Sequence, residues 1–128
     1  MNNNIEIKRI AIANRGEVAV RIIKACEELG IETLLLHSEA DVNSRAYRMS
    51  TKQICIGPAP TSESYLNIEA NIQGAIAGGA QAVHPGFGFL SENADFAEAC
   101  EQAGLIFIGP SAQTICTLGD KISCKRLA

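Results

Sequence analysis

The chain has 128 residues, which suits one domain, with 47% hydrophobic and 20% charged side chains and a formal net charge of -3. This balance is ordinary for a globular α/β protein. The mild acidity gives no electrostatic footprint for nucleic acid, no run of Lys or Arg suggests a membrane surface, and no apolar stretch approaches the roughly 20 residues of a membrane span.

Five short apolar runs recur along the chain and predict β-strands. Most are continuously apolar rather than alternating, as expected for parallel strands that are covered on both faces. The predicted strands occupy residues 9–13, 33–37, 53–56, 80–84 and 105–108.

Helical periods separate these runs. Three apolar stripes with helical spacing occupy residues 18–29, 68–76 and 96–103, and a weaker helical segment occupies residues 44–49. Asn67 suits the N-cap of the second stripe, and glycines follow all three stripes at positions where a helix ends, namely Gly30, Gly78-Gly79 and Gly104. The order of strands and helices predicts an α/β fold, with about five strands in a doubly wound parallel sheet and flanking helices.

Ligands of such sheets bind beyond the carboxyl ends of the strands. Five loops are predicted to meet at that edge, comprising residues 14–16, 37–39, 57–58, 84–93 and 109–111. The functional residues are therefore expected there.

The fourth of these loops is His84-Pro85-Gly86-Phe87-Gly88-Phe89-Leu90-Ser91-Glu92-Asn93, called the decapeptide below. Its two glycines allow a sharp turn and a close approach of a ligand to the backbone, and its proline partly fixes the loop's shape. Ser91, Glu92 and Asn93 can cap the next helix or bind a polar ligand. Both phenylalanines of the decapeptide are expected to be exposed, and a loop that only reversed the direction of the chain would not need them. A rigid turn with aromatic packing is the alternative.

The decapeptide closely resembles the signature His-Pro-Gly-Tyr-Gly-Phe-Leu-Ser-Glu-Asn of biotin carboxylases, which are ATP-grasp enzymes or enzyme domains. The resemblance extends, in the same order, from about Lys8 to the last residue. Its other landmarks are Ile12-Ala13-Asn14-Arg15-Gly16-Glu17, Cys55-Ile56-Gly57-Pro58-Ala59-Pro60, Ser64-Tyr65-Leu66-Asn67, Phe107-Ile108-Gly109-Pro110 and Gly119-Asp120-Lys121.

The resemblance implies a Rossmann-like, pre-ATP-grasp domain at the amino terminus of a biotin carboxylase. The implied division is a flexible lead at residues 1–7, the domain at residues 8–118, and at residues 119–128 the start of a linker helix toward an ATP-grasp domain that this sequence lacks. In the implied reaction, ATP activates bicarbonate as carboxyphosphate, and biotin on a carrier captures the released carbon dioxide. ATP, Mg²⁺ and biotin are the implied cofactors of the full-length parent, and the metal ligands are expected outside this chain.

By resemblance, Lys121 of the Gly119-Asp120-Lys121 landmark is expected to contact ATP. Its place at a predicted helix start fits that role, because backbone amides there already favour anions. Gly86, Phe87, Gly88 and Glu92 are expected to form one wall of the site. Phe87 departs from the family's usual tyrosine and lacks a hydroxyl donor. No catalytic residue is assigned within this chain.

Two further side chains have competing interpretations. Arg15 either anchors neighbouring loops through its guanidinium or contacts a ligand. His84 could act as a general base, because its side chain titrates near neutrality, but a structural or supporting role is expected, because no acid–base partner can be placed beside it. The polar face formed by Arg21, Lys24 and Glu28 is either solvated or, by resemblance, part of a homodimer contact.

Other partners implied by the resemblance are bicarbonate, a biotinylated carrier and a carboxyltransferase component. The resemblance leaves the final carboxyl acceptor open. Carboxylases that act on acetyl-, propionyl- or methylcrotonyl-type thioesters, on pyruvate or on urea all contain this kind of domain. The main rival interpretation is a non-catalytic interaction or oligomerisation fragment. Another branch of ATP-grasp ligases fits less well, because its members should lack the decapeptide. A nicotinamide site is disfavoured, because the first turn has a single glycine, Gly16, beside the bulky Arg15.

The five cysteines show no Cys-x-x-Cys pair or metal-type spacing and are expected as free thiols. Cys26 and Cys100 fall within predicted helices and Cys55 within a predicted strand, so these three are expected to act as small hydrophobes. Free thiols, together with an amino terminus unlike a signal peptide, predict the cytoplasm or, in a eukaryote, the mitochondrial matrix.

Overall fold

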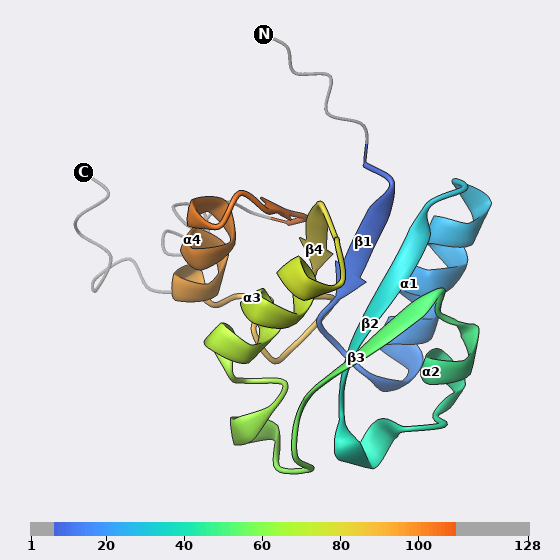
Figure 1. Ribbon diagram of the computed structural model, residues 1–128, viewed down its shortest axis with the longest axis horizontal. Helices are drawn as coiled ribbons and strands as arrows, with labels where there is room; N and C mark the ends of the chain where they lie inside the picture. Colours follow the sequence, from blue (N-terminus) through green and yellow to red (C-terminus); the bar gives the residue numbers. More distant parts are fainter. Residues whose placement is uncertain (1–6, 110–128) are drawn as a thin grey trace, which may run out of the picture.

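The computed structural model describes residues 7–109. Strands and helices alternate along the chain (Figure 1). In order, the elements are β1 (Arg9–Ile12), α1 (Gly16–Glu28), β2 (Glu32–Ser38), the 3₁₀ turn η1 (Glu39–Asp41), α2 (Arg45–Met49), β3 (Lys52–Gly57), the 3₁₀ turn η2 (Thr61–Glu63), α3 (Ile68–Ala77), β4 (Ala82–His84), α4 (Ala94–Gln102) and β5 (Ile106–Phe107).

The five strands form one sheet in the order β3-β2-β1-β4-β5, and every neighbouring pair is parallel. The chain therefore winds outward from β1 in both directions. The predicted doubly wound parallel sheet is confirmed.

The helices cover both faces of the sheet, with α1 and α2 on one side and α3 and α4 on the other (Figure 1). Alternate residues of a strand point to opposite faces. In β1, Ala11 packs with the α3–α4 side, whereas Ile10 and Ile12 pack with α1. This double coverage explains why the strands are continuously apolar.

The helix ends follow their local chemistry. Asn67 Oδ1 accepts from the amide of Ala70 at 2.9 Å, and Asn93 Oδ1 accepts from the amide of Phe96 at 2.9 Å. Gly30 follows α1 with φ of 73° and donates to Glu27 O at 3.1 Å, which closes a Schellman end. The predicted caps and stops are thus confirmed, including the short helix in residues 44–49.

Two sequence expectations need correction. Cys26 and Cys100 are buried, as expected of small hydrophobes, but Cys55 on β3 is exposed, so that expectation was wrong for it. The 3₁₀ turns η1 and η2 were not predicted, because each is a single turn too short to show an apolar period.

Within residues 7–109, no helix has the length and apolar character needed to cross a bilayer.

Candidate functional site

Loops that follow β1, β2, β3 and β4 come together at the carboxyl edge of the sheet. Hydrogen bonds join residues that are far apart in sequence, such as Asn14 with Pro85, Arg15 with Asp41, and Ser38 with Tyr65. The predicted convergence is confirmed for these four loops. Of the fifth, Gly109 is described, and residues 110–111 lie outside the described residues.

The backbone of the decapeptide makes a tight, left-handed turn. Gly86, Gly88 and Phe89 have φ of 68°, 71° and 44°. A Cβ at Gly86 would stand 2.5 Å from Val18 Cγ1 and 2.9 Å from Asn14 Nδ2, whereas a Cβ at Gly88 would meet nothing within 4 Å. Gly86 is therefore required by both conformation and space, and Gly88 by conformation alone.

Asn14 holds this turn from the loop after β1. Its Nδ2 donates to Pro85 O and to Phe87 O, each at 2.7 Å, and its Oδ1 accepts from the amide of Arg15 at 2.8 Å. The side chain is buried, so these bonds replace those it would otherwise make to water. Asn14 thereby fixes the carbonyls on both sides of Gly86.

A second set of contacts joins the loops after β1, β2 and β3. The Arg15 guanidinium donates to Asp41 through Nε at 2.7 Å and through Nη2 at 2.8 Å. The buried Tyr65 hydroxyl donates to the same carboxylate and accepts from the amide of Ser38 at 3.0 Å. The anchoring interpretation of Arg15 is therefore confirmed.

The electrostatics of this cluster fix its charges near neutral pH. The hydrogen bonds from Arg15 lower the pKa of Asp41. Burial and the bond to Asp41 raise the pKa of Tyr65 to about 12. Arg15 is thus a cation, Asp41 an anion and Tyr65 a neutral donor, and the positive and negative charges are paired.

The two phenylalanines of the decapeptide have different surroundings. Phe87 is 75% exposed. Phe89 is half-buried, and its ring stacks on Tyr65 with centroids 5.1 Å apart and 23° between the planes. The expectation that both are exposed was wrong for Phe89, because the ring of Tyr65 supplies an apolar partner that the sequence does not reveal. The loop presents one ring outward and anchors the other.

His84 supports the turn from its first position. Its Nδ1 accepts from the amide of Gly86 at 3.1 Å, which places the ring proton of the neutral form on Nε2. Burial lowers the pKa of His84, so the neutral form predominates near neutral pH. This contact agrees with the structural role expected from the sequence.

The remaining predicted site residues lie at the end of the loop or beyond it. Gly88 and Glu92 are exposed in the decapeptide. Lys121 lies outside the described residues. Within residues 7–109, no group of three or more His, Cys, Asp or Glu side chains is placed to hold a metal ion.

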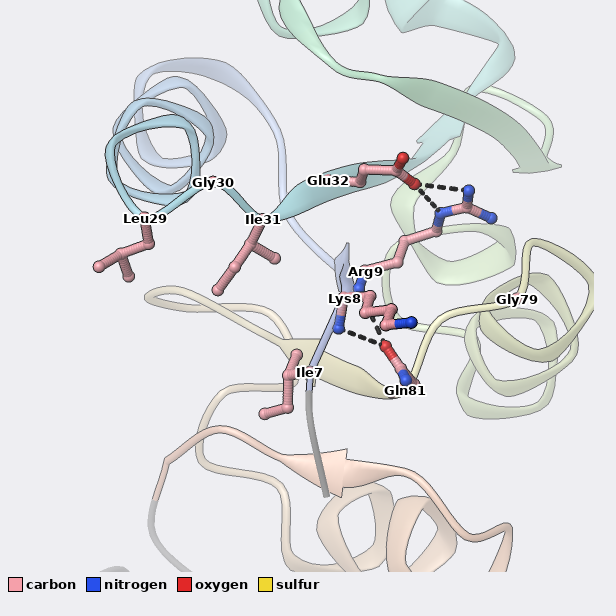
Figure 2. A pocket seen from close by; sticks show the side chains of 9 residues that line it. All are labelled: Ile7, Lys8, Arg9, Leu29, Gly30, Ile31, Glu32, Gly79 and Gln81. Carbon is pink, nitrogen blue, oxygen red and sulfur yellow. Dashed lines mark hydrogen bonds and ion pairs between the residues drawn. The ribbon is translucent and has the colours of Figure 1, made fainter. Parts of the chain in front are cut away.

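A polar cavity of about 650 Å³ lies at the opposite, amino-terminal edge of the sheet (Figure 2). Three of its polar side chains, those of Arg9, Glu32 and Gln81, already bond within the fold. Arg9 pairs with Glu32 at 2.6 Å and donates to Gly78 O at 2.6 Å, and Gln81 Oε1 accepts from the amide of Arg9 at 3.0 Å. The carboxyl edge, where an aromatic side chain points outward from a fixed loop, is the better candidate site.

Sequence reasoning missed Asp41 and the individual role of Asn14. Asn14 stands within the landmark at residues 12–17, which was the available signal. Asp41 lies 26 residues from its partner Arg15, and no local pattern marks it.

Comparison with known proteins identifies the family. Residues 6–115 match the family described as biotin carboxylase, N-terminal domain. The chain is 55% identical over 117 residues to a biotin carboxylase of Haemophilus influenzae, covering 91% of this chain and 26% of that protein. It is 49% identical over 127 residues to the mitochondrial propionyl-CoA carboxylase alpha chain of Sus scrofa, covering 99% of this chain and 17% of that one.

Solved structures agree with this match. The biotin carboxylase domain dimer of Hydrogenobacter thermophilus 2-oxoglutarate carboxylase, in complex with MgADP, ADP and bicarbonate, superimposes with a TM-score of 0.86 at 43% identity. That match covers 94% of this chain and 26% of the other. The chain thus spans about a quarter of the length of the biotin carboxylases that it matches. It belongs to the biotin carboxylase N-terminal domain family.

Proposed function

We propose that this chain is the amino-terminal part of an ATP-dependent biotin carboxylase, the longer protein referred to below as the parent. The parent carboxylates carrier-bound biotin with ATP and bicarbonate. Support comes from the family match over residues 6–115 and from a structural neighbour solved with MgADP and bicarbonate. The main observation in its favour is the decapeptide. Asn14 bonds to its backbone and Tyr65 stacks on Phe89, while the side chain of Phe87 is exposed.

In this proposal the described residues provide a wall and a scaffold rather than reacting groups. An exposed phenyl ring on a turn with fixed carbonyls suits contact with a small planar substrate group and exclusion of water from one side. Gly86, Phe87, Gly88 and Glu92 form this wall. ATP, when bound, supplies the phosphoryl group that activates bicarbonate. The Mg²⁺ ligands are part of the same proposal and are assigned to the parent's further domain, as the resemblance implies.

The domain boundaries belong to the same proposal. Residues 8–118 form the amino-terminal domain, preceded by a lead at residues 1–7, and residues 119–128 begin the connection to an ATP-grasp domain. Lys121 lies in that connection, where its ammonium group contacts the nucleotide's phosphates. A single cation at a helix start is suited to this role.

The proposed partners follow from the parent's reaction. They are bicarbonate, a biotinylated carrier, a carboxyltransferase component and a second copy of the parent. Arg21, Lys24 and Glu28 are all exposed on α1, which leaves this face available for a homodimer contact. The proposed compartment is the cytoplasm, or the mitochondrial matrix in a eukaryote.

An assay of the parent separates this function from its rival, a non-catalytic interaction fragment. Purified parent with MgATP and bicarbonate should release ADP, and free biotin should increase that release. Omission of bicarbonate should abolish it. A parent that forms oligomers but shows no bicarbonate-dependent ADP release would support the interaction fragment instead.

A further inference from the structure

The backbone amide of Gly86, in the turn of the decapeptide, is held by a histidine ring. Its N–H donates to Nδ1 of His84 at 3.1 Å. On either side of it, Pro85 O and Phe87 O accept from Asn14 Nδ2, each at 2.7 Å. His84 therefore adds a third contact around a residue that has φ of 68° and no room for a Cβ.

The contact between His84 and Gly86 requires that Nδ1 carries no proton. A backbone N–H can only donate, so Nδ1 must accept through its lone pair, and the neutral ring keeps its proton on Nε2. Protonation of the ring occupies Nδ1 and makes it a donor. Two N–H groups would then face each other, and the hydrogen bond would be lost. The contact therefore exists only while His84 is neutral.

His37, the second of the chain's two histidines, makes the opposite kind of contact. Its Nδ1 lies 2.8 Å from the carbonyl oxygen of Ser38. A carbonyl oxygen can only accept, so this Nδ1 carries the proton in the neutral ring as well as in the charged one. A second proton on Nε2 leaves the bond in place. His37 is thus an internal control, because its contact survives protonation.

The elements packed around His84 bring two ionisable side chains toward it. His84 lines a cavity along α1 together with Arg21 and Cys26 of that helix. From the neighbouring strands come Ile12 of β1, which pairs with His84, and Ile108, which follows β5 and lines the same cavity. Arg21 is a cation, and burial raises the pKa of the Cys26 thiol, which is therefore neutral. Among the described lining residues there is no Asp or Glu that would stabilise an imidazolium.

We propose that His84 makes the turn of the decapeptide sensitive to acid, because a proton on Nδ1 removes the acceptor of the Gly86 amide and loosens the turn. His84 is then a positioning residue, which acts on the wall through Gly86 and not on the reacting atoms. This consequence for the wall rests on the proposed function. The coupling of protonation to the turn does not, because it concerns the folded 128-residue chain alone.

The pH range of the effect follows from the direction of the pKa shift. Burial lowers the pKa of His84 in the folded chain, so the neutral ring and its bond to Gly86 are present at neutral pH. The unfolded chain takes up the proton near the ordinary value of about 6.5, at which the folded chain still resists it. The contribution of the contact to stability is therefore complete above about pH 6.5 and is lost as the pH falls through the folded pKa. The loss that involves Asp41 begins only below about pH 4.

Two substitutions of nearly equal shape separate the acceptor from the rest of the ring. His84→Asn places Oδ1 where Nδ1 stands and does not titrate, whereas His84→Leu has the same branched shape without an acceptor. The NMR-measured protection of the Gly86 amide against solvent exchange, corrected for pH, reports the bond. In the unmodified chain it should fall several-fold as the pH is lowered from about 7.5 to 5. It should stay high in the Asn variant and be low at every pH in the Leu variant.

The ring nitrogens provide a second measurement that needs no substitution. Long-range ¹H–¹⁵N spectra at neutral pH should show the Nε2–H tautomer for His84 and the Nδ1–H tautomer for His37. The fall in protection of Gly86 should follow the titration of His84. His37→Asn is the control, because its Nδ2 can still donate to the carbonyl of Ser38, and it should leave that fall unchanged.

Three results would overturn the proposal. They are an Nδ1–H tautomer of His84, protection of Gly86 that stays unchanged down to about pH 5, and the same acid-dependent fall in the His84→Asn chain. No substrate is present in these measurements, so each result is distinct from a failure of the proposed enzymatic function.

Discussion

At the scale of single residues, Asp41 connects the loops of the proposed site. It accepts from Arg15 and Tyr65, which follow β1 and β3, while it stands at the end of η1 after β2. The phenol of Tyr65 in turn supports Phe89 in the decapeptide. One carboxylate thus holds the tyrosine on which Phe89 of the decapeptide stacks.

This role predicts a specific dependence of stability on pH. The pKa of Asp41 is lowered in the folded chain, so its contribution is present above the unfolded value of about 3.9 and is lost as the pH falls through the folded pKa. Asp41→Asn should cost about 1–2 kcal/mol of unfolding free energy at pH 7 and flatten the loss of stability below about pH 4. Urea unfolding of the 128-residue chain from pH 7 to pH 3 measures both effects.

Glu32→Gln is the control for Asp41→Asn. Glu32 also pairs with an arginine, but its side chain is 52% exposed, against 8% for Asp41. Its loss should cost less than about 1 kcal/mol. An acid dependence of Asp41→Asn identical to that of the unmodified chain would contradict the role of the carboxylate.

The missing hydroxyl of Phe87 can be restored by Phe87→Tyr in the parent. Because the ring is exposed and packing changes little, we expect nearly unchanged ATP affinity and nearly unchanged bicarbonate and biotin kinetics. Steady-state constants for the three substrates measure this. A clear change in the bicarbonate or biotin constants alone would instead show that the family's usual hydroxyl takes part in substrate binding.

Lys121 is the one predicted nucleotide contact in the chain. Lys121→Ala in the parent should weaken ATP binding by roughly 1.5–3 kcal/mol, the scale of a charge-assisted hydrogen bond. Calorimetric titration with ATP measures the change. An unchanged affinity would reject the assignment, whatever its effect on turnover.

At the scale of elements, much of the fold could be predicted because the signals are local. The strands are continuous apolar runs, and Asn67 and the glycines mark helix ends by their own chemistry. The 3₁₀ turns and the stacking of Phe89 on Tyr65 could not be predicted, because one is too short for a period and the other joins segments distant in sequence. The decapeptide is recognisable as a motif in the sequence. The residues that hold it, Asn14 and Tyr65, belong to other loops, so their contacts could not be predicted.

The turn of the decapeptide allows a matched comparison. Gly88→Ala should cost about 1–2 kcal/mol, because alanine is strained at φ of 71° but meets no neighbour within 4 Å. Gly86→Ala has the same backbone strain and adds contacts of 2.5 Å with Val18 and 2.9 Å with Asn14. Its loss of stability should therefore be clearly larger. Equal losses in urea unfolding would show that Asn14 and Val18 yield freely and do not clamp the turn.

At the scale of the whole molecule, the domain has its own core on both sides of the sheet. Transfer of a phosphoryl group to bicarbonate needs metal-held phosphates and charge stabilisation in a closed site. The chain spans about a quarter of the length of the biotin carboxylases that it matches, and Lys121, its proposed phosphate contact, offers one point charge. The 128-residue chain should therefore fold by itself and remain catalytically inert.

The most direct test compares the purified 128-residue chain with the parent in one set of conditions. The chain should unfold cooperatively, bind ATP with a Kd of about 1 mM or weaker, and show no bicarbonate-dependent ATP hydrolysis above background. The parent should carboxylate biotin under the same conditions. Biotin-dependent turnover by the 128-residue chain, or micromolar ATP binding to it, would contradict the proposed division of the site between this domain and the rest of the parent.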